Sequence, residues 1–189
     1  SVGAGYQPIG GTSVHLDYAY THARDRVRGL DGTTAGDPRV PEWAPSTVPA
    51  HVITASAFRL IGRRATVLLQ GRLQSGIRYT PHVSGDVNGD GRFDDRAYVA
   101  TLADGNDALA LDIDQLMANA PGNVRSCLQR ALGTIAGRNS CAGPWTASLD
   151  GSLLVRLGSA NIYRQSVLRI DVLNVISGLD AALHGTGGM

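Results

Sequence analysis

The sequence contains no lysine and a single glutamate, so arginine and aspartate carry almost all of its charge. All 17 cationic residues are arginines and 15 of the 16 acidic residues are aspartates, which leaves a formal net charge of +1. A chain this close to neutrality has no general electrostatic attraction for nucleic acid or for an acidic substrate. Without lysine, it also has no phosphate-binding Gly-Lys-Ser/Thr motif.

Long hydrophobic runs and aromatic residues are scarce as well. No run of 18 apolar residues occurs, which excludes a transmembrane helix. Aromatic residues make up 5% of the chain, whereas glycine occurs 24 times among the 189 residues. Abundant glycine with short apolar runs favours strands and turns over a helix bundle. No signal peptide is present and neither end resembles that of a complete protein, so we expect an internal fragment of a longer chain.

The motifs of common catalytic sites are absent too. The five histidines lack metal-ligand spacing, and neither His-Glu-x-x-His nor Gly-x-Ser-x-Gly occurs. The adjacent Asp94 and Asp95 lie in a loop rich in Asp, Asn and Gly, where such pairs are more typical of ion ligands or solvated turns. His184, in a Leu-His-Gly sequence, is expected to make a structural hydrogen bond in a turn. We therefore expect that the chain is not an enzyme.

Five segments alternate apolar and polar residues with a period of two, which is typical of half-buried strands. Proline-rich and polar stretches separate some of them as long loops, at about 28–50 and 78–147, and the other connections are short turns. The pattern predicts an all-β fold in one domain that covers residues 1–189, an antiparallel up-and-down meander of about five long strands. The strands are expected at about 12–27, 51–61, 65–77, 148–157 and 166–176. The period of the second strand is too weak to assign its faces.

Two short helices are expected within the second long loop. The first covers residues 112–120, and the second has Asn123 as its N-cap and Gly133 just past its end. Cys127 lies on the second helix, and Cys141 follows 14 positions later. Two thiols alone make a poor zinc site, whereas in an oxidising compartment this spacing favours a local disulfide.

The second long loop begins with oxygen-bearing side chains at every second position, a spacing that suits a hard cation such as Ca²⁺. A glycine after the third of these permits a sharp turn. The twelfth position is Ala97 instead of the bidentate glutamate of an EF-hand, so the affinity would be modest. The alternative is an Asn-Gly/Asp-Gly turn held by bonds from side chains to the backbone. The candidate ligands are Asp86, Asn88, Asp90, the backbone carbonyl of Arg92, Asp94 and Asp95.

Two all-β architectures fit the alternation. In a wide membrane barrel, strands of about ten residues cross the bilayer, with tight turns on one side and long loops on the other. In a soluble β-sandwich, the apolar face forms a core and the charged face meets solvent. The asymmetry of the loops favours the barrel, whereas the low aromatic content disfavours it. In a barrel, the following charged residues would face the lumen: Asp17, Arg72, Asp150, Arg156, Arg169 and Asp171.

Several separated motifs occur in a fixed order along about residues 11–185. They are Ser-Gly-x-x-Tyr-Thr-Pro at 75–81, Gly-Asp-Val-Asn-Gly-Asp-Gly-x-x-Asp-Asp-Arg-Ala-Tyr at 85–98, Arg-Asn-Ser-Cys-Ala-Gly-Pro-Trp at 138–145, Leu-Asn-Val at 173–175, and Gly-Leu-Asp at 178–180 with Leu-His-Gly at 183–185. Through these motifs the sequence resembles Oar-like TonB-dependent receptors of the bacterial outer membrane.

The resemblance implies that the chain is an open segment of a transmembrane β-barrel, towards the C-terminal part of a receptor that takes up an unidentified extracellular ligand. The plug and the segment that contacts a TonB-type energy-coupling protein would lie N-terminal to it. The expected partners are then the lipid bilayer, the coupling protein and the ligand, with no nucleic acid. The alternative function is that of a soluble, secreted, calcium-stabilised β-sandwich for adhesion or binding.

Overall fold

The computed structural model describes residues 1–28, 39–87, 89, 91, 93, 95–105, 107–157 and 166–176. The chain divides into two compact units. The sheet unit comprises Ser1–Tyr20, Ala50–Ser75 and Trp145–Met189. The loop unit comprises Thr21–Pro49 and Gly76–Pro144, so the chain leaves the sheet unit twice and returns twice.

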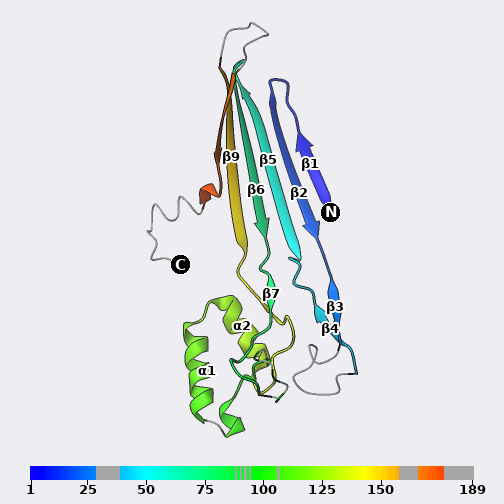
Figure 1. The fold of residues 1–189 in the computed structure, drawn as a ribbon, viewed down its shortest axis with the longest axis vertical. Coiled ribbons are helices and arrows are strands. Elements are labelled where there is room, and N and C mark those ends of the chain that lie inside the picture. The colour runs from blue at the N-terminus through cyan, green and yellow to red at the C-terminus, as the bar shows by residue number, and fades with distance from the viewer. Residues whose placement is uncertain are drawn as a thin grey trace. The chain divides into compact units, whose positions relative to one another are not determined.

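The sheet unit is built on one antiparallel sheet with the strand order β1-β2-β5-β6-β9-β10 (Figure 1). The all-β class and the antiparallel arrangement are confirmed. The sheet is open, because β1 and β10 each pair with one neighbour among the described residues. The strands are β1 (Val2–Tyr6), β2 (Thr12–Tyr20), β5 (His51–Ile61), β6 (Ala65–Gln74), β9 (Thr146–Leu157) and β10 (Ser166–Val172).

The sheet therefore has six strands, one more than expected. The additional strand, β1, has the sequence Val-Gly-Ala-Gly-Tyr, whose alternate glycines give no contrast between apolar and polar positions. β5 has the bounds that the sequence predicted. β6 and β10 end before the predicted residues 77 and 176, and β9 begins two residues before residue 148.

The first long excursion contains a two-stranded sheet. β3 (Arg24–Val27) pairs with β4 (Glu42–Pro45), so the predicted strand 12–27 is in fact two strands, β2 and β3, separated by residues 21–23. The expectation that residues 28–50 contain no regular strand was wrong, because β4 lies among them. Pro45 is its last residue, a position where the missing N–H of proline breaks no interior ladder bond.

The second excursion carries β7 (Arg78–Tyr79), a short 3₁₀ helix η2 (Leu102–Asp104), α1 (Asp107–Asn119), α2 (Gly122–Ala131) and β8 (Cys141–Ala142). The two α-helices were predicted, but α1 begins five residues before residue 112. The earlier start places Asp107 in the first turn, where a carboxylate favours the helix N-terminus. Asn123 lies inside α2 and is not its cap; its amide donates to the carbonyl of Ala142 at 3.0 Å. Among the described residues, no helix is long and apolar enough to cross a membrane.

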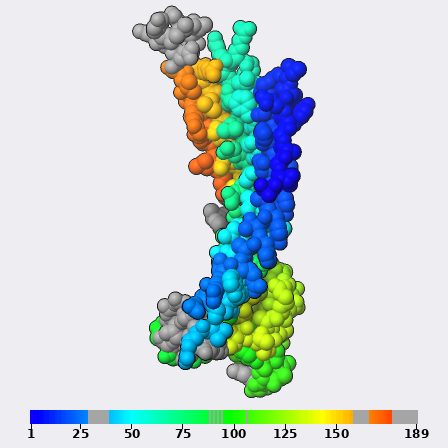
Figure 2. Space-filling model, turned by 90° about the vertical axis from the view of Figure 1, so that its right-hand side faces the viewer, coloured from blue at the N-terminus to red at the C-terminus, as the bar shows by residue number. Residues whose placement is uncertain are grey.

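The buried residues lie in the loop unit. Val99, Leu128 and Ala131 form the centre of a small core, against which partly buried side chains of both helices pack. Residues 107–135, green to yellow-green in Figure 2, form a compact block. None of the described residues of the sheet unit is buried. The two units therefore differ in how far their apolar side chains are removed from solvent.

Candidate functional site

The charged face of the sheet is fixed by the pairing of its strands. Asp17 lies opposite Thr54, Thr54 opposite Arg72, and Arg72 opposite Ser148. Directly opposite residues project from the same side of a sheet, and alternate residues along a strand share that side. The strand register thus places all six predicted lumen-facing residues on one face. Besides Asp17 and Arg72, these are Asp150, Arg156, Arg169 and Asp171.

On this face, some polar contacts join residues of the same strand and others join neighbouring strands. The Arg169 guanidinium contacts the Asp171 carboxylate at 2.8 Å, two positions along β10. The Ser152 hydroxyl on β9 also donates to Asp171. Asp150 accepts from the backbone N–H of Asn174 at 2.7 Å. The ion pair between Arg169 and Asp171 therefore lies within β10 and does not cross between strands.

The register determines which residues of β5 lie on each face of the sheet, which the sequence left open. Ile53 lies opposite Tyr18 on one side and Leu73 on the other. Ile53 and its alternate neighbours therefore belong to the apolar face, whereas Thr54 and Ser56 belong to the charged face. The weak period arises because small residues occupy both faces near the middle of this strand.

The apolar face of the sheet extends across all six strands and is largely exposed, with Arg59 as a charged residue near one end of β5. Leu16 in β2 is 52% exposed and Ile170 in β10 is 47% exposed. Exposed apolar patches of this extent are rare on soluble monomers. By register, its apolar members include Val14, Leu16, Tyr18, Ile53, Leu69, Leu73, Leu149, Leu153, Val155, Leu168, Ile170 and Val172.

An aromatic cluster lies at one end of the apolar face. The Tyr18 hydroxyl is hydrogen-bonded to Nδ1 of His51 at 2.8 Å. The His51 ring stacks on Trp145 with a centroid distance of 5.9 Å, and Tyr20 is 5.1 Å from His51. Low overall aromatic content concealed this cluster, since its members come from the end of β2, the start of β5 and the residue before β9.

In the loop unit, two of the motifs that carry the family resemblance meet. β7, in the motif at 75–81, pairs with β8, in the motif at 138–145. The Thr80 hydroxyl accepts from the Asn139 backbone N–H at 2.9 Å, and the Asn139 amide donates to the Pro45 carbonyl at 2.8 Å. A side chain at Gly76 would collide with the backbone of Gly143, because an added Cβ would lie 1.8 Å from its carbonyl oxygen. Glycine is therefore required where these two segments approach.

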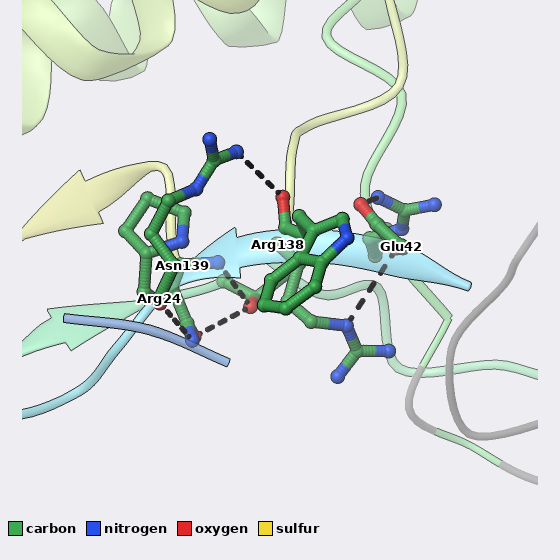
Figure 3. Close-up of polar contacts among 8 residues, drawn as sticks. Arg24, Glu42, Arg138 and Asn139 are labelled. Carbon is green, nitrogen blue, oxygen red and sulfur yellow. Dashed lines mark hydrogen bonds and ion pairs between the residues drawn. The ribbon is translucent and has the colours of Figure 1, made fainter. Parts of the chain in front are cut away.

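Glu42, the single glutamate of the sequence, is one of the residues whose polar contacts are drawn in Figure 3. Its carboxylate contacts the Arg96 guanidinium at 2.9 Å and the Arg138 guanidinium at 3.8 Å. The side chains of both arginines are mostly removed from solvent. The Arg24 guanidinium donates to the carbonyl of Trp43 at 3.0 Å. The cluster therefore links β3 and β4 to the second excursion through charged groups.

The disulfide prediction is confirmed: Cys127 in α2 is bonded to Cys141 in β8, with a distance of 5.3 Å between the Cα atoms. Both cysteines are buried. The bond therefore connects the small helical core to the β7–β8 pair.

The calcium prediction stays a prediction. Asn88, Asp90, Arg92 and Asp94 lie outside the described residues. Asp86 accepts from the N–H groups of Gly89 at 2.7 Å and Gly91 at 2.9 Å, and the buried Asp95 accepts from the Val87 N–H at 2.6 Å. These bonds are the ones expected of a turn held by its side chains, the alternative interpretation of this loop. Within the described part of the chain, no three His, Cys, Asp or Glu residues form a metal-binding group.

Comparison with known proteins yields no match to this chain among family models, curated proteins or solved structures.

The motif at 173–175 lies in the described region, whereas residues 178–185, with His184, lie outside it.

Proposed function

We propose that this chain forms part of the barrel wall of an outer-membrane TonB-dependent receptor that takes up an extracellular ligand. The observation that carries the proposal is the two-faced sheet, which combines a broad, mainly apolar face with a face that holds all six predicted lumen charges. A transmembrane barrel needs this arrangement, because alternate residues face lipid and the wet interior.

The strand lengths support the proposal. β5 has 11 residues and β9 has 12. At a rise of about 3.3 Å per residue, an 11-residue strand is about 36 Å long. Tilted by about 45°, it covers roughly 26 Å, which matches the apolar band of about 25 Å on outer-membrane barrels.

The exposed apolar face favours a membrane over a soluble sandwich. A sandwich covers that face with a second sheet about 10 Å away. The described residues of the sheet unit form a single sheet, and none of them is buried. Acyl chains would cover the face instead, and further strands would pair with the open edges at β1 and β10, as a closed barrel requires.

The aromatic cluster provides further support. Tyr and Trp gather where a barrel meets the lipid headgroups, because each ring has an apolar body and a polar group. Tyr18 and Trp145 lie on the apolar face at the strand ends from which the long excursions leave. The disulfide in the loop unit agrees with a location outside the cytoplasm, because disulfides persist in oxidising surroundings such as the periplasm and the cell surface.

Trp145 allows a direct test, because the chain has two tryptophans and Trp43 belongs to the loop unit. The variant Trp43→Phe leaves Trp145 as the only tryptophan. In vesicles whose lipids carry bromine at different depths, we expect bromine near the headgroups to quench Trp145 more strongly than bromine near the bilayer centre. The matched variant Trp145→Phe reports Trp43 and should show little quenching by any brominated lipid.

Solubility separates the proposal from the secreted module. We expect the chain to aggregate in water and to become monodisperse only with detergent or lipid. A detergent-free monomer with a cooperative thermal transition, together with Trp145 quenched by iodide and not by brominated lipid, would overturn the membrane assignment.

A further inference from the structure

The loop unit contains an apolar cavity of about 400 Å³, which has no part in the proposed barrel wall. Leu109, Ile113 and Leu116 contribute one wall from α1, and Leu128 contributes another from α2. The three α1 residues follow a spacing of four and three, so they share one face of the helix. Tyr98 and Ile135, joined by a backbone bridge, line the opposite part.

Exposed apolar side chains surround the hollow. Leu116 is 51% exposed and Tyr98 is 40% exposed, although both line the cavity. Most of the other lining groups are hydrocarbon, and the Arg96 guanidinium at its edge is engaged by Glu42. The lining therefore favours a ligand without net charge, since a charged group would lose its hydration without gaining an opposite charge.

The cavity walls are held by several covalent and hydrogen-bonded restraints. The Cys127–Cys141 disulfide fixes α2, and Leu128 directly follows the first of these cysteines. The Asp104 carboxylate accepts from the backbone N–H and the hydroxyl of Thr101, at 2.6 and 2.8 Å, and it is also hydrogen-bonded to Tyr98, which lines the cavity. A site formed in advance loses less free energy on binding, because fewer groups must be ordered.

The size of the cavity limits the ligand. Ligand pockets commonly have volumes of about 300–1,000 Å³. An apolar cavity of about 150 Å³ is large enough for benzene. On that scale, 400 Å³ holds two to three aromatic rings or an aliphatic group of similar volume.

We infer that the loop unit binds an uncharged, largely hydrocarbon small molecule of two to three rings in size in the cavity between α1, α2 and the Tyr98–Ile135 bridge. The site requires no contact with lipid, so it does not depend on the barrel assignment. His82 lines the cavity and offers a place for one polar group of the ligand, such as a hydroxyl or carbonyl, whereas the Tyr98 hydroxyl is already hydrogen-bonded to Asp104.

The test uses the full chain in mild detergent and N-phenyl-1-naphthylamine, an uncharged three-ring dye that fluoresces in apolar surroundings. Micelles and the apolar face of the sheet give a background common to all variants. Leu116→Arg places a charge at the cavity, whereas Leu111→Arg places it at a 59% exposed residue on the other side of α1. Leu116→Gln is a milder second variant, and helical circular dichroism with an intact disulfide verifies the fold of each protein.

We expect a saturable component of dye binding in the parent and in Leu111→Arg. Its dissociation constant should be at least tenfold larger in Leu116→Arg, with a smaller increase in Leu116→Gln. Equal titrations in all four folded proteins, or the absence of a saturable component in the parent, would overturn the inference.

Discussion

The sheet unit and the loop unit use different means to order the chain. In the sheet unit, long strands pair in register while the apolar side chains of one face remain exposed. In the loop unit, strands are as short as two residues, and a small core, a disulfide and the Glu42 cluster hold the segments together. The difference shows that the described residues of the sheet unit bury none of their own side chains, whereas the loop unit forms a small core of its own.

The largest effect is expected from a charge on the apolar face of the sheet. In lipid, Leu153→Arg should lower the free energy of unfolding by about 2–4 kcal/mol, because acyl chains cannot solvate the guanidinium near the bilayer centre. Gln70→Arg, on the charged face, is the control and should have little effect. Unfolding by guanidinium chloride in vesicles measures the free energy of unfolding of both variants. Equal values for the two would show that the faces of the sheet are wrongly assigned.

Removal of the disulfide should act on the loop unit alone. Because the bond closes a loop of about 15 residues, the double variant Cys127→Ser, Cys141→Ser should destabilise this unit by about 3 kcal/mol. Hydrogen exchange should show lost protection in α2 and β8 and unchanged protection in β5 and β6. Equal loss in both units would mean that they unfold together, contrary to the comparison above.

Loss of the single glutamate should have an intermediate effect. Glu42→Ala leaves the Arg96 and Arg138 guanidinium groups without this carboxylate, which should cost about 1–3 kcal/mol. Asp25→Ala, an exposed acid on the neighbouring strand, is the control and should change stability by no more than about 0.5 kcal/mol. Thermal unfolding of the loop unit distinguishes the two variants, and indistinguishable midpoints would contradict a structural role for Glu42.

The smallest expected effect is the loss of the Thr101–Asp104 turn at low pH. Hydrogen bonds from Thr101 hold the pKa of Asp104 below its usual value. The stabilisation of this turn is therefore fully present above the ordinary aspartate pKa of about 3.9, and it is lost as the pH falls through the lowered pKa. The chemical shift of the Thr101 amide should report a midpoint below that ordinary value. Asp104→Asn should abolish the titration, and a midpoint at or above the ordinary value would refute the prediction.

Alternation in the sequence was sufficient to predict most of the sheet. Strand β5 has the predicted bounds. In β6 and β9, the alternation correctly predicted that Arg72 and Asp150 lie on the same face of the sheet. β1 was missed because its glycines carry no hydropathy, and β4 was missed because nearby prolines suggested a loop. Both strands become evident only through their partners, which local sequence does not specify.

The contacts of the loop unit were harder to predict. The disulfide followed from a spacing of 14 residues, which is local information. The contacts of Glu42 could not be predicted from local sequence, because Arg96 and Arg138 lie 54 and 96 positions away along the chain. The apolar cavity was also missed, because its walls combine two helices with the isolated Tyr98–Ile135 bridge.

The two-part composition of the loop unit has a consequence for folding. The Asn139 amide bonds to the Pro45 carbonyl across 94 residues of chain. Contacts so distant in sequence form slowly, because the intervening chain must first lose its conformational freedom. As the chain is synthesised from its N-terminus, β3 and β4 can pair with each other early, whereas their contact with Asn139 and the Cys127–Cys141 disulfide both require the end of the second excursion. The second excursion would therefore complete the fold of the loop unit, because it anchors strands that were synthesised long before it.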